Sequence, residues 1–315
     1  EAGLVLTELD KNTLIGYQVG KALSGSAGSG NQTFIGYKAG TAVTSGDANT
    51  YIGSRAAELA TTGLQNVAVG IAAMAAADGN EANNTALGAY AMQNSNNDQT
   101  SLNVFIGLQA GKGGTGAQSR NVGIGYLSLG GSGTSAQSNN VAVGYQAGAG
   151  LTSGDDNTAV GYQTMLNATT GNDNVAIGKL AIGSGVLTGA NNIAIGEGSG
   201  FDLTAGGYNI LLGLRSGANI TTANKNIFIG QDVGLAVTVT NSAESDGTVG
   251  IGHDALKALT SGTSNVAVGF SALKVEDDGD HNTAIGYNSL KNQTGTSGAV
   301  SNTALGFASG DGITT

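Results

Sequence analysis

The chain has 315 residues, of which 55 are glycine, and it contains no proline, cysteine or tryptophan. Only 11% of the residues are charged and 40% are hydrophobic, which excludes the composition of a chain that stays disordered. The net charge of −10, with twelve basic residues scattered singly, excludes an electrostatic footprint for nucleic acid or an anionic membrane. Without cysteine there is no disulfide, thiolate metal site or thiol nucleophile.

Residues 1–11 precede the first repeat and are predicted to form an N-terminal cap or donor segment, with Gly3 to Leu6 as its apolar part. No apolar run approaches the ~18 residues that span a bilayer. The first ten residues lack the basic start and apolar core of a signal peptide, and the chain begins at Glu1. We therefore expect a processed product or a fragment.

Residues 12–315 repeat one motif, N-x-x-[IVL]-G, seventeen times, mostly at intervals of 17 residues and at most 22. The motifs close at Gly16, Gly36, Gly53, Gly70, Gly88, Gly107, Gly125, Gly144, Gly161, Gly178, Gly196, Gly213, Gly230, Gly252, Gly269, Gly286 and Gly306. A short period over the whole chain indicates a solenoid in which each repeat stacks on its neighbours. We predict an all-β, parallel β-solenoid (β-roll) of 17 coils with about 17 residues per coil, forming a repeat shaft over residues 12–315.

The first motif position is asparagine in fifteen of the seventeen repeats, with Gln32 and Thr248 as the departures. Side-chain amides at one place in successive coils are predicted to bond to each other and to turn backbone. The alternative, a row of exposed ligand-binding amides, is the weaker interpretation because the column follows the period of the scaffold.

The second motif position is always β-branched and the fourth is always Ile, Val or Leu. Because positions spaced by two share one face of a strand, we predict that both point into the coil. The glycine suits a sharp turn or a close backbone approach. The residue three positions later is always small, and we expect a second short strand there, followed by a turn-rich loop.

The third position then points away from the core. None of its seventeen residues is charged, and Tyr51 alone carries a polar group. An apolar stripe of this length on the outer face requires a cover, and identical copies in closed symmetry would supply one. We therefore expect a parallel homotrimeric fibre, with end-to-end stacking as a further way for the chain to associate with itself.

No residue is predicted to be catalytic, to bind a cofactor or to hold a metal. The pair His253 and Asp254 could be half of a catalytic arrangement, but both occupy positions that should be exposed, and His281 lies in another repeat. The acidic residues 276–278 and Asp280 could hold calcium, although a solvated loop is favoured. The glycine-rich stretch 111–116 lacks the order of a phosphate-binding loop.

Aromatic residues follow the closing glycine in many repeats, and we expect them to stack on each other rather than to bind sugars or bases. The intervals longer than usual start at Gly16, Gly88, Gly125, Gly230 and Gly286. Their extra residues are predicted to lie in surface loops, which tolerate insertion, and these loops are the first candidates for receptor contact.

The units "NTAIGYNSL", "NVAVGYQAG" and "NTAVGYQTM" resemble the N-[ST]-x-A-[IV]-G units in the heads of trimeric autotransporter adhesins. They are still more similar to the "NTA-[IV]-G-Y-x-[AS]-L" repeats of phage tail-fibre proteins. The resemblance covers Asn12 to the C-terminus and implies trimers: left-handed parallel β-rolls in the adhesin heads and shafts that reach for a cell in the fibres. The coils here are longer than those of the adhesin heads and lack the S-x-A-x-G half of that unit, which favours the fibre.

Together these features predict a non-enzymatic structural fibre segment, extracellular or on a virion surface, that spaces or displays receptor-binding elements. Its expected partners are its own copies and a cell-surface receptor or glycan, without nucleic acid, membrane insertion or cofactors. Two alternatives stay open, a bacterial trimeric adhesin head that binds a host surface or matrix and a self-assembling extracellular filament subunit. A polysaccharide-cleaving spike would require carboxylates converging within about 6 Å in an open groove.

Overall fold

The computed structural model describes residues 11–24, 30–113, 116–131, 136–237, 246–294 and 298–314. These residues form an all-β chain without a helix, a parallel β-solenoid of about 15 turns with about 18 residues per turn. The predicted all-β, parallel β-solenoid is confirmed, with about 15 turns instead of the predicted 17 coils and a turn slightly longer than the predicted 17 residues. The chain divides into two compact units, Glu1–Asp156 and Asn157–Thr315, and each is described by itself. The proposed cap lies almost wholly outside the described residues.

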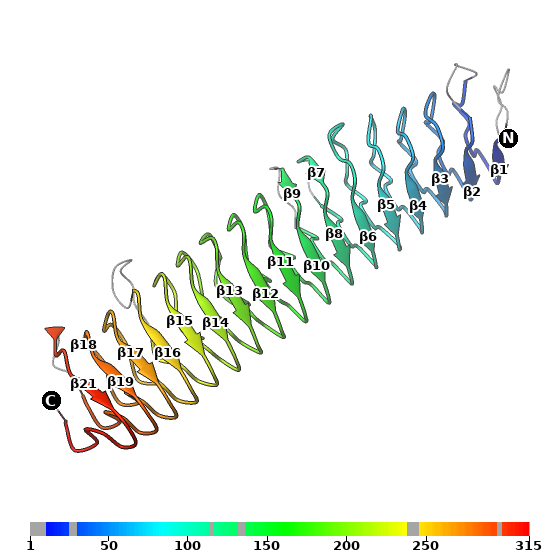
Figure 1. The fold of residues 1–315 in the computed structure, drawn as a ribbon. Coiled ribbons are helices and arrows are strands. Elements are labelled where there is room, and N and C mark those ends of the chain that lie inside the picture. Colours follow the sequence, from blue (N-terminus) through cyan, green and yellow to red (C-terminus); the bar gives the residue numbers. More distant parts are fainter. Residues whose placement is uncertain are drawn as a thin grey trace. The chain divides into compact units, whose positions relative to one another are not determined.

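Each of the seventeen motifs places its second to fourth residues in a strand. In the first unit, successive strands pair in parallel and in chain order (Figure 1). They are β1 (Thr13–Ile15), β2 (Thr33–Ile35), β3 (Thr50–Ile52), β4 (Val67–Val69), β5 (Thr85–Leu87), β6 (Val104–Ile106), β8 (Val122–Ile124) and β10 (Val141–Val143). Two short strands, β7 (Gln118–Ser119) and β9 (Gln137–Ser138), pair beside this sheet.

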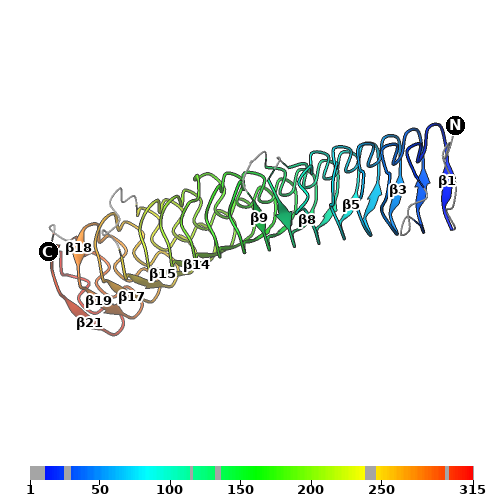
Figure 2. The same ribbon diagram turned by 90° about the horizontal axis from the view of Figure 1, so that it is seen from above.

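The second unit repeats this arrangement, and Figure 2 shows its strands following one another from a second direction. Its strands are β11 (Thr158–Val160), β12 (Val175–Ile177), β13 (Ile193–Ile195), β14 (Ile210–Leu212), β15 (Ile227–Ile229), β16 (Val249–Ile251), β17 (Val266–Val268), β19 (Thr283–Ile285) and β21 (Thr303–Leu305). The short strands β18 (Gly279–Asp280) and β20 (Gly298–Ala299) pair with each other.

The strand side chains point the opposite way from the prediction. The third motif position is buried in every one of these strands except β1, and no second or fourth position is buried. In β12, for example, Ala176 is fully buried while Ile177 is 36% exposed. The expectation that the β-branched positions fill the coil was therefore wrong, and so was the outward stripe of third positions.

A thin interior explains this orientation. Residues six positions apart face each other across the core, and their sizes compensate. Where the third position is Phe34, Phe105 or Phe228, the facing residue is glycine, and a Cβ at Gly40 would lie 2.7 Å from the Phe34 ring. Where the third position is alanine, the facing residue is often a buried Met, Ile or Leu, as in Ala68/Met74, Ala176/Ile182 and Ala267/Leu273. At most levels a large residue thus faces a small one, as close packing requires. At Ala142/Gly148 and Ala194/Gly200 both residues are small, and leucines of the adjoining coils, Leu129 and Leu211, lie beside these glycines.

The segment after each closing glycine is a turn and not the expected second strand. The second and fourth residues past every closing glycine have positive φ, for example 58° at Lys38 and 57° at Gly40. A backbone that returns to the left-handed region at every other residue cannot extend into a strand. Successive turns still pair through backbone hydrogen bonds, such as Lys38 N to Tyr17 O at 2.9 Å.

The closing glycines allow the coils to approach one another. Gly53 has φ of 137°, and a Cβ placed on it would lie 2.7 Å from the carbonyl carbon of Gly70 in the next coil. Both the backbone conformation and the space therefore require glycine at this position. The predicted role of this residue in close backbone approach is confirmed.

The asparagine column forms the predicted ladder of amides. The Asn209 side chain donates to Asn192 Oδ1 at 3.0 Å and to Ala223 O at 2.9 Å, and its own Oδ1 accepts from Asn226 N at 3.1 Å. Gln32 continues the pattern, since its side-chain oxygen accepts from Asn49 N at 3.0 Å. The amides are buried, which confirms their structural role rather than a row of exposed ligand-binding groups.

We predict that Phe228→Ala and Gly234→Leu each destabilise the chain and that the double variant recovers much of the loss. Phe228→Ala leaves a cavity that costs about 3–5 kcal/mol. Gly234→Leu places a side chain where the Phe228 ring lies. Together they recreate the Ala267/Leu273 pair of another coil, in which leucine already adopts φ of 48°. Urea unfolding of the four proteins gives the coupling energy, and strictly additive losses would contradict the compensation.

We also predict that Asn209→Ala lowers the free energy of unfolding by about 2–4 kcal/mol, because the buried groups Ala223 O and Asn226 N lose their bonds to its side chain, while Asn192 Oδ1 keeps only the bond from Asn209 N. Asn219→Ala, at a partly exposed amide outside the ladder, is the control and should change stability much less. Both losses are measured from urea unfolding midpoints. Equal losses would show that an amide in the ladder contributes no more to stability than an amide outside it.

Candidate functional site

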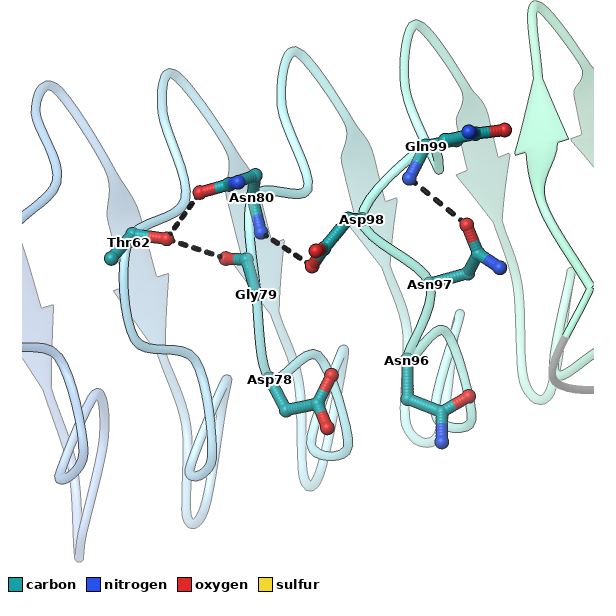
Figure 3. Close-up of a pocket in the computed structure, with 8 residues that line it drawn as sticks. All are labelled: Thr62, Asp78, Gly79, Asn80, Asn96, Asn97, Asp98 and Gln99. Atoms are coloured by element: carbon teal, nitrogen blue, oxygen red, sulfur yellow. Dashed lines mark hydrogen bonds between the residues drawn. The ribbon is translucent and has the colours of Figure 1, made fainter.

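A polar groove of about 650 Å³ opens in the first unit between the loops of two successive coils (Figure 3). Residues 78–80 form one wall, residues 96–99 form the other, and Thr62 of the preceding coil completes it. The second wall belongs to the 19-residue interval that starts at Gly88. Its residues Asn96, Asp98 and Gln99 are exposed, so the predicted surface placement of the extra residues is confirmed for this coil.

Hydrogen bonds hold both walls of the groove (Figure 3). Asn80 N donates to Asp98 Oδ1 at 3.1 Å and connects the two loops. The Thr62 hydroxyl donates to Asn80 Oδ1 at 2.6 Å, and Gln99 N donates to Asn97 Oδ1 at 3.0 Å. Backbone pairing between the coils resumes beside the groove, as at Ala82 N to Thr100 O. The groove is therefore a local parting of two loops within a continuous stack.

A buried carboxylate supports the first wall from beneath. Glu81 is 1% exposed and stands where neighbouring coils carry glycine, at Gly46 and Gly63. Its two oxygens accept from Asp78 N at 3.3 Å and from Gly79 N at 3.1 Å. Burial raises the pKa of Glu81 above its usual 4.5, and the two backbone donors only partly offset that rise.

This pKa shift predicts how stability depends on pH. Because the Glu81 pKa is raised on folding, its contribution to stability is complete below pH 4.5 and is lost as the pH rises through the raised value. The stability difference between Glu81→Gln and the unmodified protein should therefore shift in favour of the unmodified protein as the pH falls from neutral towards 4.5.

Thermal unfolding of both proteins across this pH range measures that difference, with Glu58→Gln as the control for removing a less buried carboxylate. A difference that stays constant with pH would show that Glu81 is ionised equally readily in the folded and unfolded chain.

The second surface feature is an apolar face on the outside of each unit. The second and fourth motif positions supply it, and they include Ile177 at 36%, Ile193 at 37% and Ile195 at 38% exposure. Because the strands pair residue for residue, the fourth positions form a continuous aliphatic row in each unit, while threonines such as Thr158 and Thr283 interrupt the row of second positions. Isolated apolar residues on a surface are ordinary, whereas continuous rows of this kind mark an interaction surface.

Stacked rings run along part of this surface, at the position after the closing glycine. In the second unit, His253, Phe270, Tyr287 and Phe307 stack with ring centroids 5.1–5.4 Å apart. In the first unit Tyr17 stacks on Tyr37 and Tyr126 on Tyr145. The predicted stacking is confirmed. Since neighbouring rings cover each other's faces, the ladder presents mainly ring edges, which suits packing better than sugar stacking.

Within the described segments, neither histidine lies in a catalytic arrangement with a nucleophile. His253 is exposed as expected, but Asp254 is only 5% exposed, contrary to the prediction. Burial would raise the pKa of Asp254, but its bonds to Lys274 at 2.8 Å and Lys257 at 3.0 Å outweigh burial and lower it. Asp254 is therefore part of an ion-pair cluster, and His281 lies exposed in another coil.

The acidic loop brings carboxylate oxygens of Glu276, Asp277 and Asp278 within 4.8 Å of one another. Glu276 is fully buried, however, and its oxygens accept from Gln293 Nε2 at 2.6 Å and from Gly279 N at 2.8 Å. It replaces a core aliphatic residue and belongs to an internal polar network. This arrangement explains the acidic residue structurally, and it is not the convergent carboxylate pair in an open groove that a polysaccharide-cleaving site needs.

The remaining sequence candidates have structural roles or lie outside the described residues. Asp280 Oδ1 accepts from Thr263 N at 2.7 Å and ties two coils together. Gly111, in the glycine-rich stretch, faces the Phe105 ring in the core. Of the other long intervals, residues 25–29, 132–135, 238–245 and 295–297 lie outside the described residues.

Comparison with protein-family models, curated proteins and solved structures finds no match for this chain. Among the described residues, no helix is long and apolar enough to cross a membrane. Within the described residues, the polar groove and the outer apolar face are the features on which the proposals below rest.

Proposed function

We propose that the chain is a structural segment of a homotrimeric fibre on a virion or cell surface, where it spaces or displays receptor-binding elements. The outer apolar face carries this proposal. The expected stripe of third positions lies inside the solenoid, but the second and fourth positions expose an equivalent stripe along each unit, with Ile177 and Ile195 among its members. Identical copies can bury this stripe on one another.

Closed symmetry favours copies of the same chain as the cover. The strands pair residue for residue, so β-branched and aliphatic side chains recur at every coil in the same place. A partner with the same period can match these rows along their full length, and parallel copies related by a rotation axis do so at every level. The number three comes from the resemblance of the repeat to tail-fibre shafts and adhesin heads.

The role is mechanical rather than catalytic. A solenoid whose coils contact only their neighbours extends with each added repeat, and such a stack gives a fibre its reach. The acidic and histidine candidates are engaged in structural contacts, such as the pairing of Asp254 with Lys274. An extracellular or virion-surface location follows from this role.

A bacterial adhesin head is the second candidate, and the polar groove in the first unit favours it. A shaft that only spaces other elements has no need of a groove lined by hydrogen-bonding side chains. The two candidates share the trimer and differ in whether the segment itself makes contact with a surface molecule.

The trimer is tested by Ile177→Asp and Ile195→Asp, each on the exposed face. In the assembled protein each substitution would bury like charges beside one another, so the assembly should dissociate while the solenoid stays folded. Val186→Asp, at a residue 56% exposed outside these rows, is the matched control. Light scattering should give three times the 30.8 kDa chain mass for the unmodified protein and the control.

The two face variants should instead give the mass of one chain with the unmodified circular dichroism spectrum. A stable monomer of the unmodified protein at micromolar concentration would refute the assembly proposal, and a stable dimer would refute the number three.

A further inference from the structure

We infer that the groove between residues 78–80 and 96–99 binds a neutral carbohydrate, an oligosaccharide of a few units, through side-chain amides and carboxylates. Its volume of about 650 Å³ lies within the range of small-molecule sites. This inference rests on the proposed function in one respect: a surface location is where the protein would encounter such a sugar. The binding itself needs one unit of one chain.

The lining has the hydrogen-bonding chemistry that sugar hydroxyls match. The lining includes the amides of Asn80, Asn96, Asn97 and Gln99, which carry both donors and acceptors, and two aspartates, which carry acceptors. The Oδ1 atoms of Asn80 and Asn97 already accept from Thr62 and Gln99. A hydroxyl group donates one hydrogen bond and accepts others, so a polyol can satisfy amide and carboxylate groups together. None of the lining residues has an aliphatic or aromatic side chain, which disfavours an apolar ligand.

The charges of the groove select among polar ligands. Asp78 and Asp98 are its charged residues, and no lysine, arginine or histidine lines it. An anionic sugar or a phosphate would meet repulsion there without a compensating cation. A neutral sugar avoids that cost and can still donate to both carboxylates.

A compact metal ion fits the groove less well than an extended ligand. In the described part of the chain, the acidic groups that converge within 4.8 Å are residues 276–278, away from this groove. Asp98 Oδ1 already accepts from Asn80 N, and Asp78 and Asp98 come from different loops (Figure 3). Separated hydrogen-bonding groups along an open channel suit a chain of hydroxyl groups.

The walls are held in place before a ligand arrives. Glu81 ties down the backbone of residues 78 and 79, Asp98 packs against Gly79, and Thr62 orients the Asn80 amide. Preorganised polar groups lose less side-chain entropy on binding, which lowers one of the costs of binding at a shallow site. A single groove should still bind at only about millimolar Kd, and three copies in one fibre would raise the avidity on a surface.

The experiment is ligand-observed NMR of the intact protein with chitotriose, cellotriose and mannotriose as neutral probes and sialyllactose as the anionic probe. At least one neutral trisaccharide should show saturation transfer at concentrations up to about 10 mM, and sialyllactose should bind more weakly. Excess EDTA should leave the signal unchanged. Comparing the three neutral probes also shows whether the groove prefers a chain of amino sugars, of glucose or of mannose.

The groove variant is Asn96→Ala with Gln99→Ala, and the matched control is Gln65→Ala with Asn219→Ala, at surface amides outside the groove. The groove variant should weaken the bound trisaccharide by about tenfold or more, and the control should not. Asn96→Trp, which fills the groove, is a second way to remove binding. Light scattering and thermal unfolding of each variant check that assembly and fold are retained.

Three results would overturn the inference: no neutral probe binds, binding persists in both groove variants, or binding requires a divalent cation. None of these three results tests the trimer proposal, because the mass measured by light scattering does not depend on the sugar. Conversely, a monomeric protein that binds a neutral trisaccharide in this groove would refute the fibre and retain the site.

Discussion

In-register parallel pairing of successive coils is the constraint on which the rest of the structure depends. Each three-residue strand faces the same three positions of the next coil, so any residue type repeated in the sequence becomes a continuous column. Asparagine in such a column passes hydrogen bonds from coil to coil, as Asn49, Asn66 and Asn84 do. Glycine in its column removes the Cβ that would otherwise meet the next backbone. Both columns are required because the backbones lie one strand spacing apart.

The same constraint limits the width of the core. Strand and turn face each other across a thin interior, and a large residue on one side requires a small one on the other, as Phe228 with Gly234 shows. Aliphatic side chains at the flanking strand positions therefore remain outside. The proposed assembly rests on this exposure: the strands bury their alanines and expose their isoleucines, and copies of the chain are the proposed cover for the isoleucines.

Each unit has local features at coils whose residue type or length differs from that of the other coils. The polar groove lies where Glu81 replaces the glycine of neighbouring coils and the next coil is longer. Replacing a core aliphatic residue with Glu276 places a carboxylate in the interior, where Gln293 satisfies it. One difference accompanies an open groove and the other an internal network, although both begin with an acidic residue near a loop. Burial and hydrogen-bond partners distinguish them, and residue type does not.

The sequence by itself determined the period, the strand positions, the amide ladder, the close-approach glycines and the ring stacks, because each depends only on which residue recurs at which position. Its long interval after Gly88 also pointed to the loop that forms one wall of the groove. Tertiary structure decided which strand face is inside. Positions three and four are nearly all apolar and position two is a β-branched residue, often threonine, so the alternation along three residues is too weak to orient the strand. The size compensation between residues such as Ala176 and Ile182 carries that information in the sequence, but it becomes interpretable only once the two are known to face each other. The turn conformation and the burial of Asp254 and Glu276 were likewise decided by neighbouring coils, whose contacts lie a full turn away along the chain.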